Sequence, residues 1–207
     1  MAAALSSDRV DCGQDAPCPR RTSRRQQILD AAGQCFRQSG FHAASMASIA
    51  GLAGQSVGQI YRYFANKEAI IAAIVDQHLV ELRETFDQLQ SLPGSTAELI
   101  ADRVPEILAE KLDLSRAGLV LEVLAEAARN PKIAAILRAA DIEERGLCRS
   151  IFARDRKPDW SDAEFEARCD VLRVLFDGLI FRAVNQPDVD RAALAAVIRA
   201  TIHNLTL

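Results

Sequence analysis

The stretch Gln55–Phe64, QSVGQIYRYF, decides how the N-terminal part of this chain folds. Ser56 and Gln59 fit the S-x-x-Q capping box, in which the serine accepts an unpaired backbone amide and the glutamine reaches back. A short helix is therefore expected at 56–63. A helix of about two turns is marginal alone and has to be held by packing. Ile60 and Phe64 offer an apolar inner side for that packing, whereas the outer side carries glutamine, glycine, tyrosine and arginine.

Two further helices are expected before this stretch. Residues 46–53 follow Ser45, a preferred N-cap residue, and a glycine-bearing turn at 53–55 joins them to the helix at 56–63. A longer amphipathic helix is expected at 23–39, behind a further capping serine. A helix, a tight glycine turn and a second helix form the layout of a helix-turn-helix.

Helix signals continue to the C-terminus, and no strand alternation interrupts them. Capping boxes stand at Ser95–Glu98 and Ser161–Glu164, and Asn130-Pro131 places an N-cap residue before the residue best suited to a first helical position. The expected helices are 67–91, 96–111, 115–129, 131–154, 162–185 and 189–204. We predict an all-α fold with a disordered tail (1–20), a three-helix head (21–66) and a C-terminal helical domain (67–207) that begins with a long helix.

Charge is distributed unevenly along the 207 residues, although the formal net charge is only −3. Residues 20–67 carry a net +6, whereas residues 68–207 carry a net −7. Arg24 and Arg25 stand at the start of a helix, where cations oppose the helix dipole. An anion supplied from outside would explain them, and a solvated cluster is the alternative. A basic head on an acidic body indicates a nucleic-acid contact.

The outer face of QSVGQIYRYF has the side chains that read DNA. Glutamine pairs with adenine and arginine with guanine in the major groove. The tyrosine hydroxyls, and serines at the start of the preceding helix, are suited to phosphate oxygens. Gly58 removes a side chain where nucleic acid would approach the backbone. Core packing or capping is the alternative for each residue. The predicted DNA-binding residues are Arg24, Arg25, Ser45, Ser48, Gln55, Ser56, Val57, Gly58, Gln59, Tyr61, Arg62 and Tyr63.

Two segments of this region resemble the DNA-binding region of the TetR family of bacterial transcriptional regulators. They read ILDAAGQCFRQSGF and SMASIAGLAGQSVGQIYRYFANKEAII. The resemblance implies a recognition helix at 56–62, phosphate contacts from Tyr61, Tyr63 and Lys67, and a two-fold dimer. It also implies that residues 67–207 form a ligand-binding and dimerisation domain.

The acidic body shows no catalytic pattern. Its histidines lie far from one another, and no glycine-rich phosphate loop or metal-ligand spacing is present, so we expect neither an enzyme nor a metal or cofactor. The five cysteines are odd in number and lack a CxxC spacing. The start of the chain lacks the pattern of a secretory signal. These features indicate free thiols in a reducing cytoplasm, and the resemblance implies that the cytoplasm is bacterial.

Residues 119–126 are hydrophobic nearly all round, so this helix is expected to be central. Its Glu122 and Glu126 either pair with arginines such as Arg103 and Arg173 or face a ligand. By the resemblance, the body holds a small-molecule cavity. The candidates for its lining are Phe86, Arg103, Glu122, Glu126, Trp160, Phe165, Phe176 and Phe181.

The last two helices carry apolar stripes that could be core or a dimer face. By the resemblance, they pack against their symmetry mates as a four-helix interface. The candidate interface residues are Leu172, Leu175, Leu179, Leu194, Val197, Ile198 and Ile202.

The expected function is a dimeric repressor that a small molecule releases from a palindromic DNA operator. Two alternatives remain open. One is a helical protein-interaction module that does not bind DNA. The other is a regulator switched by oxidation of Cys12, Cys18 or Cys35.

Overall fold

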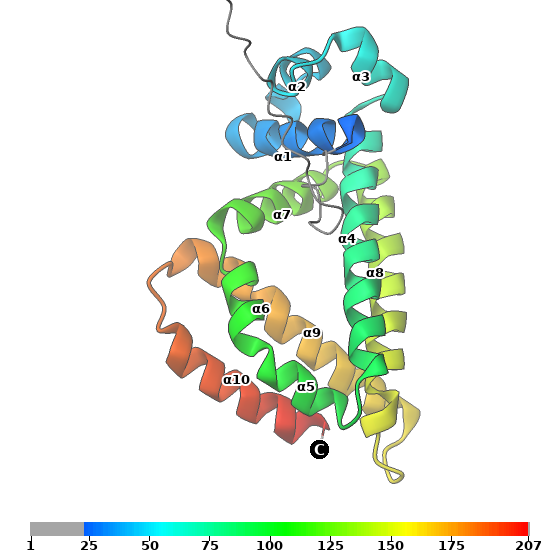
Figure 1. The fold of residues 1–207 in the computed structure, drawn as a ribbon, viewed down its shortest axis with the longest axis vertical. Helices are drawn as coiled ribbons and strands as arrows, with labels where there is room; N and C mark the ends of the chain where they lie inside the picture. Colours follow the sequence, from blue (N-terminus) through cyan, green and yellow to red (C-terminus); the bar gives the residue numbers. More distant parts are fainter. Residues whose placement is uncertain (1–22, 207) are drawn as a thin grey trace, which may run out of the picture.

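The computed structural model describes residues 23–206, and the predicted tail at 1–20, with Cys12 and Cys18, lies outside them. The described residues form ten α-helices, one short 3-10 helix and no strand, which confirms the all-α prediction (Figure 1). The helices are α1 Arg24–Ala43, α2 Met46–Leu52, α3 Val57–Tyr63, α4 Lys67–Ser91, α5 Thr96–Asp102, α6 Val104–Lys111, α7 Leu114–Ala127, α8 Pro131–Phe152, α9 Asp162–Asn185 and α10 Arg191–Thr206, with η1 at Ala153–Asp155. Over the same residues, no helix is long and apolar enough to cross a membrane.

Local capping fixes most helix starts. At α3 both halves of the predicted box form, with the Gln59 amide 3.2 Å from Ser56 Oγ and the Ser56 amide 3.0 Å from Gln59 Oε1. At α1 only the serine half forms, because the side chain of Gln26 donates to Asp30 instead.

One predicted helix is wrong in its extent. The segment 96–111 forms two helices, α5 and α6, that meet at Arg103. Pro105 stands in the first turn of α6. Because proline has no backbone N–H to donate to the preceding turn, an uninterrupted helix across this position is disfavoured.

The helices are arranged as a head, a pair of long helices and a body (Figure 1). Helices α1, α2 and α3 form the head at one end of the molecule. Helices α4 and α8 pack along each other. Helices α5, α6, α9 and α10 form most of the opposite end, and α7 crosses between this part and the head.

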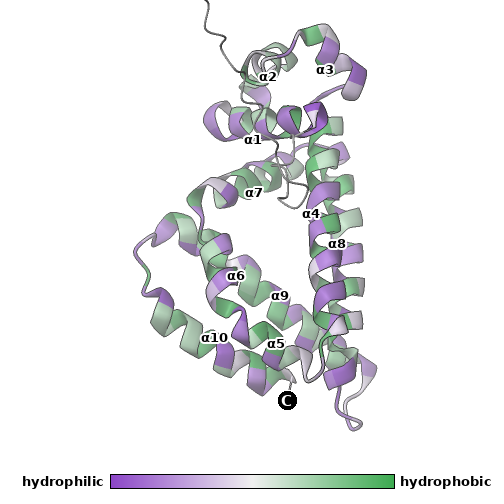
Figure 2. Ribbon diagram, in the orientation of Figure 1, coloured by the Kyte–Doolittle hydropathy of each residue, from purple (hydrophilic) through white to green (hydrophobic). Residues whose placement is uncertain are grey.

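The hydrophobic core has two parts, and the head shares one of them with the body. Ile28, Ile49 and Ile60 of the head are buried in the same cluster as Val123 of α7 and Ile133 of α8. The second cluster joins the end of α4 to α5–α10. The head therefore packs against α7 and α8, and α4 follows it directly along the chain. Figure 2 shows how apolar residues are distributed along these helices.

Candidate nucleic-acid interface and effector cavity

Helix α3 is held by its inner side. Ile60 is fully buried, and Phe64, the C-cap residue, is also buried. The guanidinium of Arg25 from α1 lies 5.4 Å from the centroid of the Phe64 ring. The apolar spacing that predicted an inner side therefore matches the packing.

The outer side of α3 is uncovered. Val57, Tyr61 and Tyr63 are 40%, 54% and 46% exposed, and Arg62 is exposed beside them. A Cβ added at Gly58 would meet no atom within 4 Å, so the packing of the described residues does not require glycine there. This face, Val57, Gly58, Tyr61, Arg62 and Tyr63, is called the α3 face below.

The predicted polar contacts of the head are partly used within the chain. Ser45 and Ser48 cap α2, with the Ser48 hydroxyl donating to the Ser45 carbonyl at 2.8 Å, and Ser56 and Gln59 cap α3. These serines stay exposed, as do Arg24 and Arg25 at the start of α1. Their side chains can still reach an external anion or base.

Two residues predicted to contact DNA, Gln55 and Lys67, form hydrogen bonds within the chain instead. The side-chain amide of Gln55 donates to the Arg24 carbonyl at 3.3 Å, so it is bound to the start of α1. The ammonium of Lys67 donates to the carbonyls of Phe41, His42 and Ala44, so its three donors are used at the end of α1. Both residues connect the helices of the head.

A cavity of about 390 Å³ lies between α4, α5, α6, α8 and α9 and is also bordered by the start of α7. Of the predicted lining residues, Phe86, Arg103 and Phe176 border it. Other apolar walls come from Leu89, Ile100 and Leu172, and charged groups come from Glu81, Arg116 and Asp177. The cavity thus combines an apolar surface with charges of both signs.

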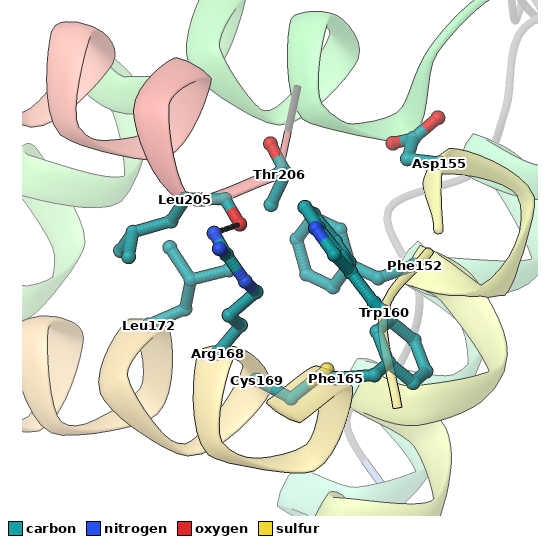
Figure 3. Close-up of a pocket in the computed structure, with 9 residues that line it drawn as sticks. All are labelled: Phe152, Asp155, Trp160, Phe165, Arg168, Cys169, Leu172, Leu205 and Thr206. Atoms are coloured by element: carbon teal, nitrogen blue, oxygen red, sulfur yellow. Dashed lines mark hydrogen bonds between the residues drawn. The ribbon is translucent and has the colours of Figure 1, made fainter. Parts of the chain in front are cut away.

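The remaining aromatic candidates do not border this cavity. Trp160 and Phe165 border a separate space of about 10 Å³, which is large enough for about one water molecule (Figure 3). Arg168 closes that space: its guanidinium lies 4.1 Å from the Trp160 ring centroid and donates to the Leu205 carbonyl at 3.0 Å. Phe181 points outward from α9 and is 58% exposed. Apolar spacing alone could not show to which side of a helix each ring turns.

Glu122 and Glu126 also lie away from the cavity, at the junction of α7 with α1. Glu122 Oε1 accepts the Phe41 amide at 2.7 Å. Glu126, only 1% exposed, binds Arg129 at 2.8 Å and Asn130 at 3.0 Å. Burial raises the pKa of Glu126, but these hydrogen bonds and the neighbouring His42 outweigh it, so the pKa lies below its ordinary value of 4.5. The predicted pairing with Arg103 or Arg173 does not form, because the partners come from the head and from the end of α7.

Most of the predicted dimer residues are core residues of one chain. Leu172, Leu179, Ile198 and Ile202 are buried, Leu175 and Leu194 are partly buried, and Val197 is 64% exposed. The exposed apolar side chains of α9 are Val171, Val174, Phe181 and Val184. Val171, Val174 and Phe181, with Gly178 between the last two, follow a 171–174–178–181 heptad spacing that is visible in the sequence. The neighbouring stripe of Leu172, Leu175 and Leu179 is more hydrophobic and therefore dominates the sequence pattern.

The cysteines of the described residues are buried. Cys35 Sγ lies 3.9 Å from the Ser48 hydroxyl. Cys148 and Cys169 are neighbours, and the interaction with Cys169 together with burial raises the pKa of Cys148. No exposed thiol is present among residues 23–206.

Two family models match the chain. Residues 28–74 match the bacterial regulatory proteins of the tetR family, and residues 106–207 match the C-terminal domain of the BetI-type transcriptional repressors. The HTH-type transcriptional regulator UidR of Escherichia coli K12 is 34% identical over 118 residues, which are 55% of this chain and 57% of UidR. BetI of Escherichia coli O45:K1 is 36% identical over 77 residues, 37% of this chain and 40% of BetI. The matched regions thus span about half of these curated relatives or less.

Solved structures extend the similarity over the length of the fold. Salmonella enterica GusR has a TM-score of 0.72 and 26% identity, with 88% of this chain and 95% of GusR covered. The SmeT–triclosan complex has a TM-score of 0.72 at 19% identity, with 87% of this chain and 90% of SmeT covered, and shares the fold. The matched N-terminal and C-terminal models, together with these relatives, show that the chain belongs to the tetR family of bacterial regulatory proteins.

Proposed function

We propose that this chain is a dimeric, ligand-responsive transcriptional repressor that binds a palindromic DNA operator and leaves it when a small molecule binds. The observation that carries this proposal is the α3 face. Its arginine and two tyrosines are exposed, the inner Ile60 and Phe64 are buried, and α3 itself lies at the tip of the head (Figure 1). Side chains that no intramolecular contact requires are available for a partner, and their chemistry suits DNA.

Within the proposed complex, the α3 face enters the major groove. Arg62 is the candidate for guanine O6 and N7, and Gln59 for adenine, since its amide nitrogen is not used by the α3 cap. Tyr61 and Tyr63 fit phosphate oxygens, as do Arg24 and Arg25. Two copies of α3 would reach successive grooves about 34–36 Å or a multiple apart.

The dimer would form through the outer sides of α9 and α10. Val171, Val174 and Phe181 lie on one side of α9 with Gly178 between them, and Val197 is exposed on α10. Contiguous exposed apolar residues of this kind mark association surfaces. This stripe replaces the buried leucines and isoleucines of the sequence-based prediction.

The effector would occupy the cavity of about 390 Å³. This volume is in the range of small-molecule sites, and its apolar walls with a few charged groups are typical of them. Phe86, Phe176 and Arg103 are the candidates for contacting the effector. The chain would catalyse no reaction and would act on chromosomal DNA in the cytoplasm.

Operator selection tests the proposal. Purified protein is mixed with pooled fragments of its own genomic DNA, and the retained fragments are sequenced. We expect enrichment of one inverted repeat, with an affinity that falls steeply as salt rises because phosphate contacts release counterions. Absence of enrichment even at low salt would contradict DNA binding and favour the alternative of a helical protein-interaction module.

A further inference from the structure

Cys148 and Cys169 form a pair of thiols inside the body. Cys148 lies on α8 and Cys169 on α9, and the two side chains are neighbours. They are 7% and 6% exposed and belong to the same hydrophobic cluster. Both are free thiols. Two free thiols side by side can be joined by a single oxidation to a disulfide.

The packing of α8 on α9 holds the two thiols at the same level. Arg145 of α8 pairs with Asp170 of α9 at 2.8 Å. One turn further along α8, Arg149 pairs with Glu166 at 2.5 Å, which lies one turn back along α9. The two helices therefore run antiparallel here, and both thiols lie within the turn that these ion pairs bracket. This register suits a disulfide, which requires neighbouring side chains on adjacent backbone segments.

The large cavity gives one of these thiols a path to small molecules. Cys148 borders the cavity of about 390 Å³, whereas Cys169 borders the small space beside Trp160 and Phe165 (Figure 3). A molecule that fits in the cavity can therefore reach Cys148 in the folded protein. Cys35 is as buried, at 4%, but belongs to the hydrophobic cluster of the head, away from both spaces. Because thiol reactivity depends on access, Cys148 and Cys35 should differ in it.

We infer that Cys148 and Cys169 are an oxidation site, at which small uncharged two-electron oxidants such as hydrogen peroxide enter the cavity and convert the two thiols into a disulfide between α8 and α9. The site is separate from the α3 face and does not depend on the proposed operator binding. It also differs from the oxidation alternative that the sequence left open, which concerned Cys12, Cys18 and Cys35.

The reaction proceeds in two steps that balance. Peroxide first transfers an oxygen atom to the Cys148 sulfur: an S–O bond forms, the O–O bond breaks, and the departing hydroxide leaves as water with the thiol proton. The Cys169 sulfur then attacks the sulfenic sulfur of Cys148, the S–O bond breaks, and a second water leaves with the Cys169 proton. The two sulfurs together lose two electrons, which reduce one peroxide to two waters.

The first step is expected to be slow near neutral pH. The neighbouring Cys169 and burial raise the pKa of Cys148 above its ordinary 9.0, while Arg173 lowers it to a smaller extent. Since the thiolate is the reactive form, a raised pKa keeps most of Cys148 protonated and unreactive. The pair should therefore stay reduced until an oxidant accumulates.

Peptide mapping of the wild-type protein tests the site. Reduced protein is treated with hydrogen peroxide, with the small reagent diamide or with glutathione disulfide, the remaining thiols are alkylated, and the protein is digested with trypsin. We expect the first two oxidants to link GLCR (146–149) to CDVLR (169–173), with the loss of two hydrogen atoms and reversal by dithiothreitol. The Cys148 thiol should disappear at least about tenfold faster than the Cys35 thiol, because only Cys148 is reached through the cavity. Glutathione disulfide is bulkier and charged and should leave the pair reduced.

Two variants distinguish the roles of the two sulfurs. In Cys169→Ala the linked peptide is absent, and Cys148 stops at the sulfenic acid, which dimedone traps. In Cys148→Ala the Cys169 thiol is expected to stay reduced, because it does not border the large cavity. Oxidation of Cys169 in that variant at the wild-type rate would overturn the route through the cavity. A pair that is oxidised only in urea, or no faster than Cys35, would overturn the site itself, as would a Cys148 linked to Cys12 or Cys18.

Discussion

The ammonium of Lys67 lies 2.7 Å from the carbonyl oxygen of Ala44 and 4.4 Å from the centroid of the Phe41 ring. It also donates to the carbonyls of Phe41 and His42. Carbonyls at the end of a helix lack partners within that helix, and a cation there also complements the helix dipole. Lys67 therefore joins the first turn of α4 to the last turn of α1.

Replacing Lys67 by methionine tests this assignment. The carbonyls lose a charged donor, so we expect the free energy of unfolding to fall by about 1.5–3 kcal/mol in urea titrations. The salt dependence of operator binding is expected to stay the same. The opposite result would be an unchanged stability together with a slope of log affinity against log salt concentration that is shallower by about one. That result would show that Lys67 contacts phosphate, as the sequence resemblance implies.

Replacing Arg62 by alanine tests base recognition by the α3 face. If Arg62 reads a guanine, the variant loses about 1–3 kcal/mol of discrimination at one operator position. Binding to a set of single-base operator variants measures this loss. Tyr61→Phe is the comparison, since loss of a phosphate contact weakens binding to every sequence alike. If Arg62→Ala weakens binding to every sequence equally, Arg62 contacts the DNA backbone and not a base.

The exposed apolar residues Val171, Val174 and Phe181 of α9 predict which substitutions separate the proposed dimer. A charge at Val174, which is 71% exposed, leaves the core of one chain intact but would be buried without a partner in the proposed dimer. We expect Val174→Glu to be monomeric in sedimentation experiments at concentrations where the wild type is dimeric. Ile142→Glu, at an equally exposed position on α8, is the control and stays dimeric. Dimers of normal stability in Val174→Glu would place the interface elsewhere.

Glu126 predicts a pH dependence of stability. Its pKa lies below the ordinary 4.5 in the folded chain, so its ionised form stabilises the fold. This contribution is fully present above about pH 4.5 and is lost as the pH falls through the lowered folded-state pKa. The stability advantage of wild type over Glu126→Gln should therefore be constant from pH 7 to 5 and shrink below that. Urea titrations at each pH measure it, and an advantage that grows in acid would contradict the assignment.

Much of the head could be predicted because its signals are local. A capping serine binds an amide three residues away. Ser56 and Gln59 therefore indicate the start of α3 independently of how α3 packs in the fold. The glycine turn and the inward spacing of Ile60 and Phe64 then indicate a helix-turn-helix. The outer face follows by exclusion, since side chains opposite a packed side face outward.

The body was less predictable because most of its helices have apolar residues on more than one side. On α9 both Leu172 and Val174 are hydrophobic, but only the packing of α6, α7, α8 and α10 decides that Leu172 is core and Val174 is surface. The same holds for Phe176, which borders the large cavity, and Phe181, which faces outward.

The helices, their caps and the polar outer face of α3 were thus set by contacts within about four residues and can be predicted from the order of amino acids. The roles of Glu122, Gln55 and Lys67 were decided by tertiary structure, because their partners lie 81, 31 and 23–26 positions away. A polar side chain binds whichever group the packing brings within about 3 Å, and for these residues that group belongs to another helix.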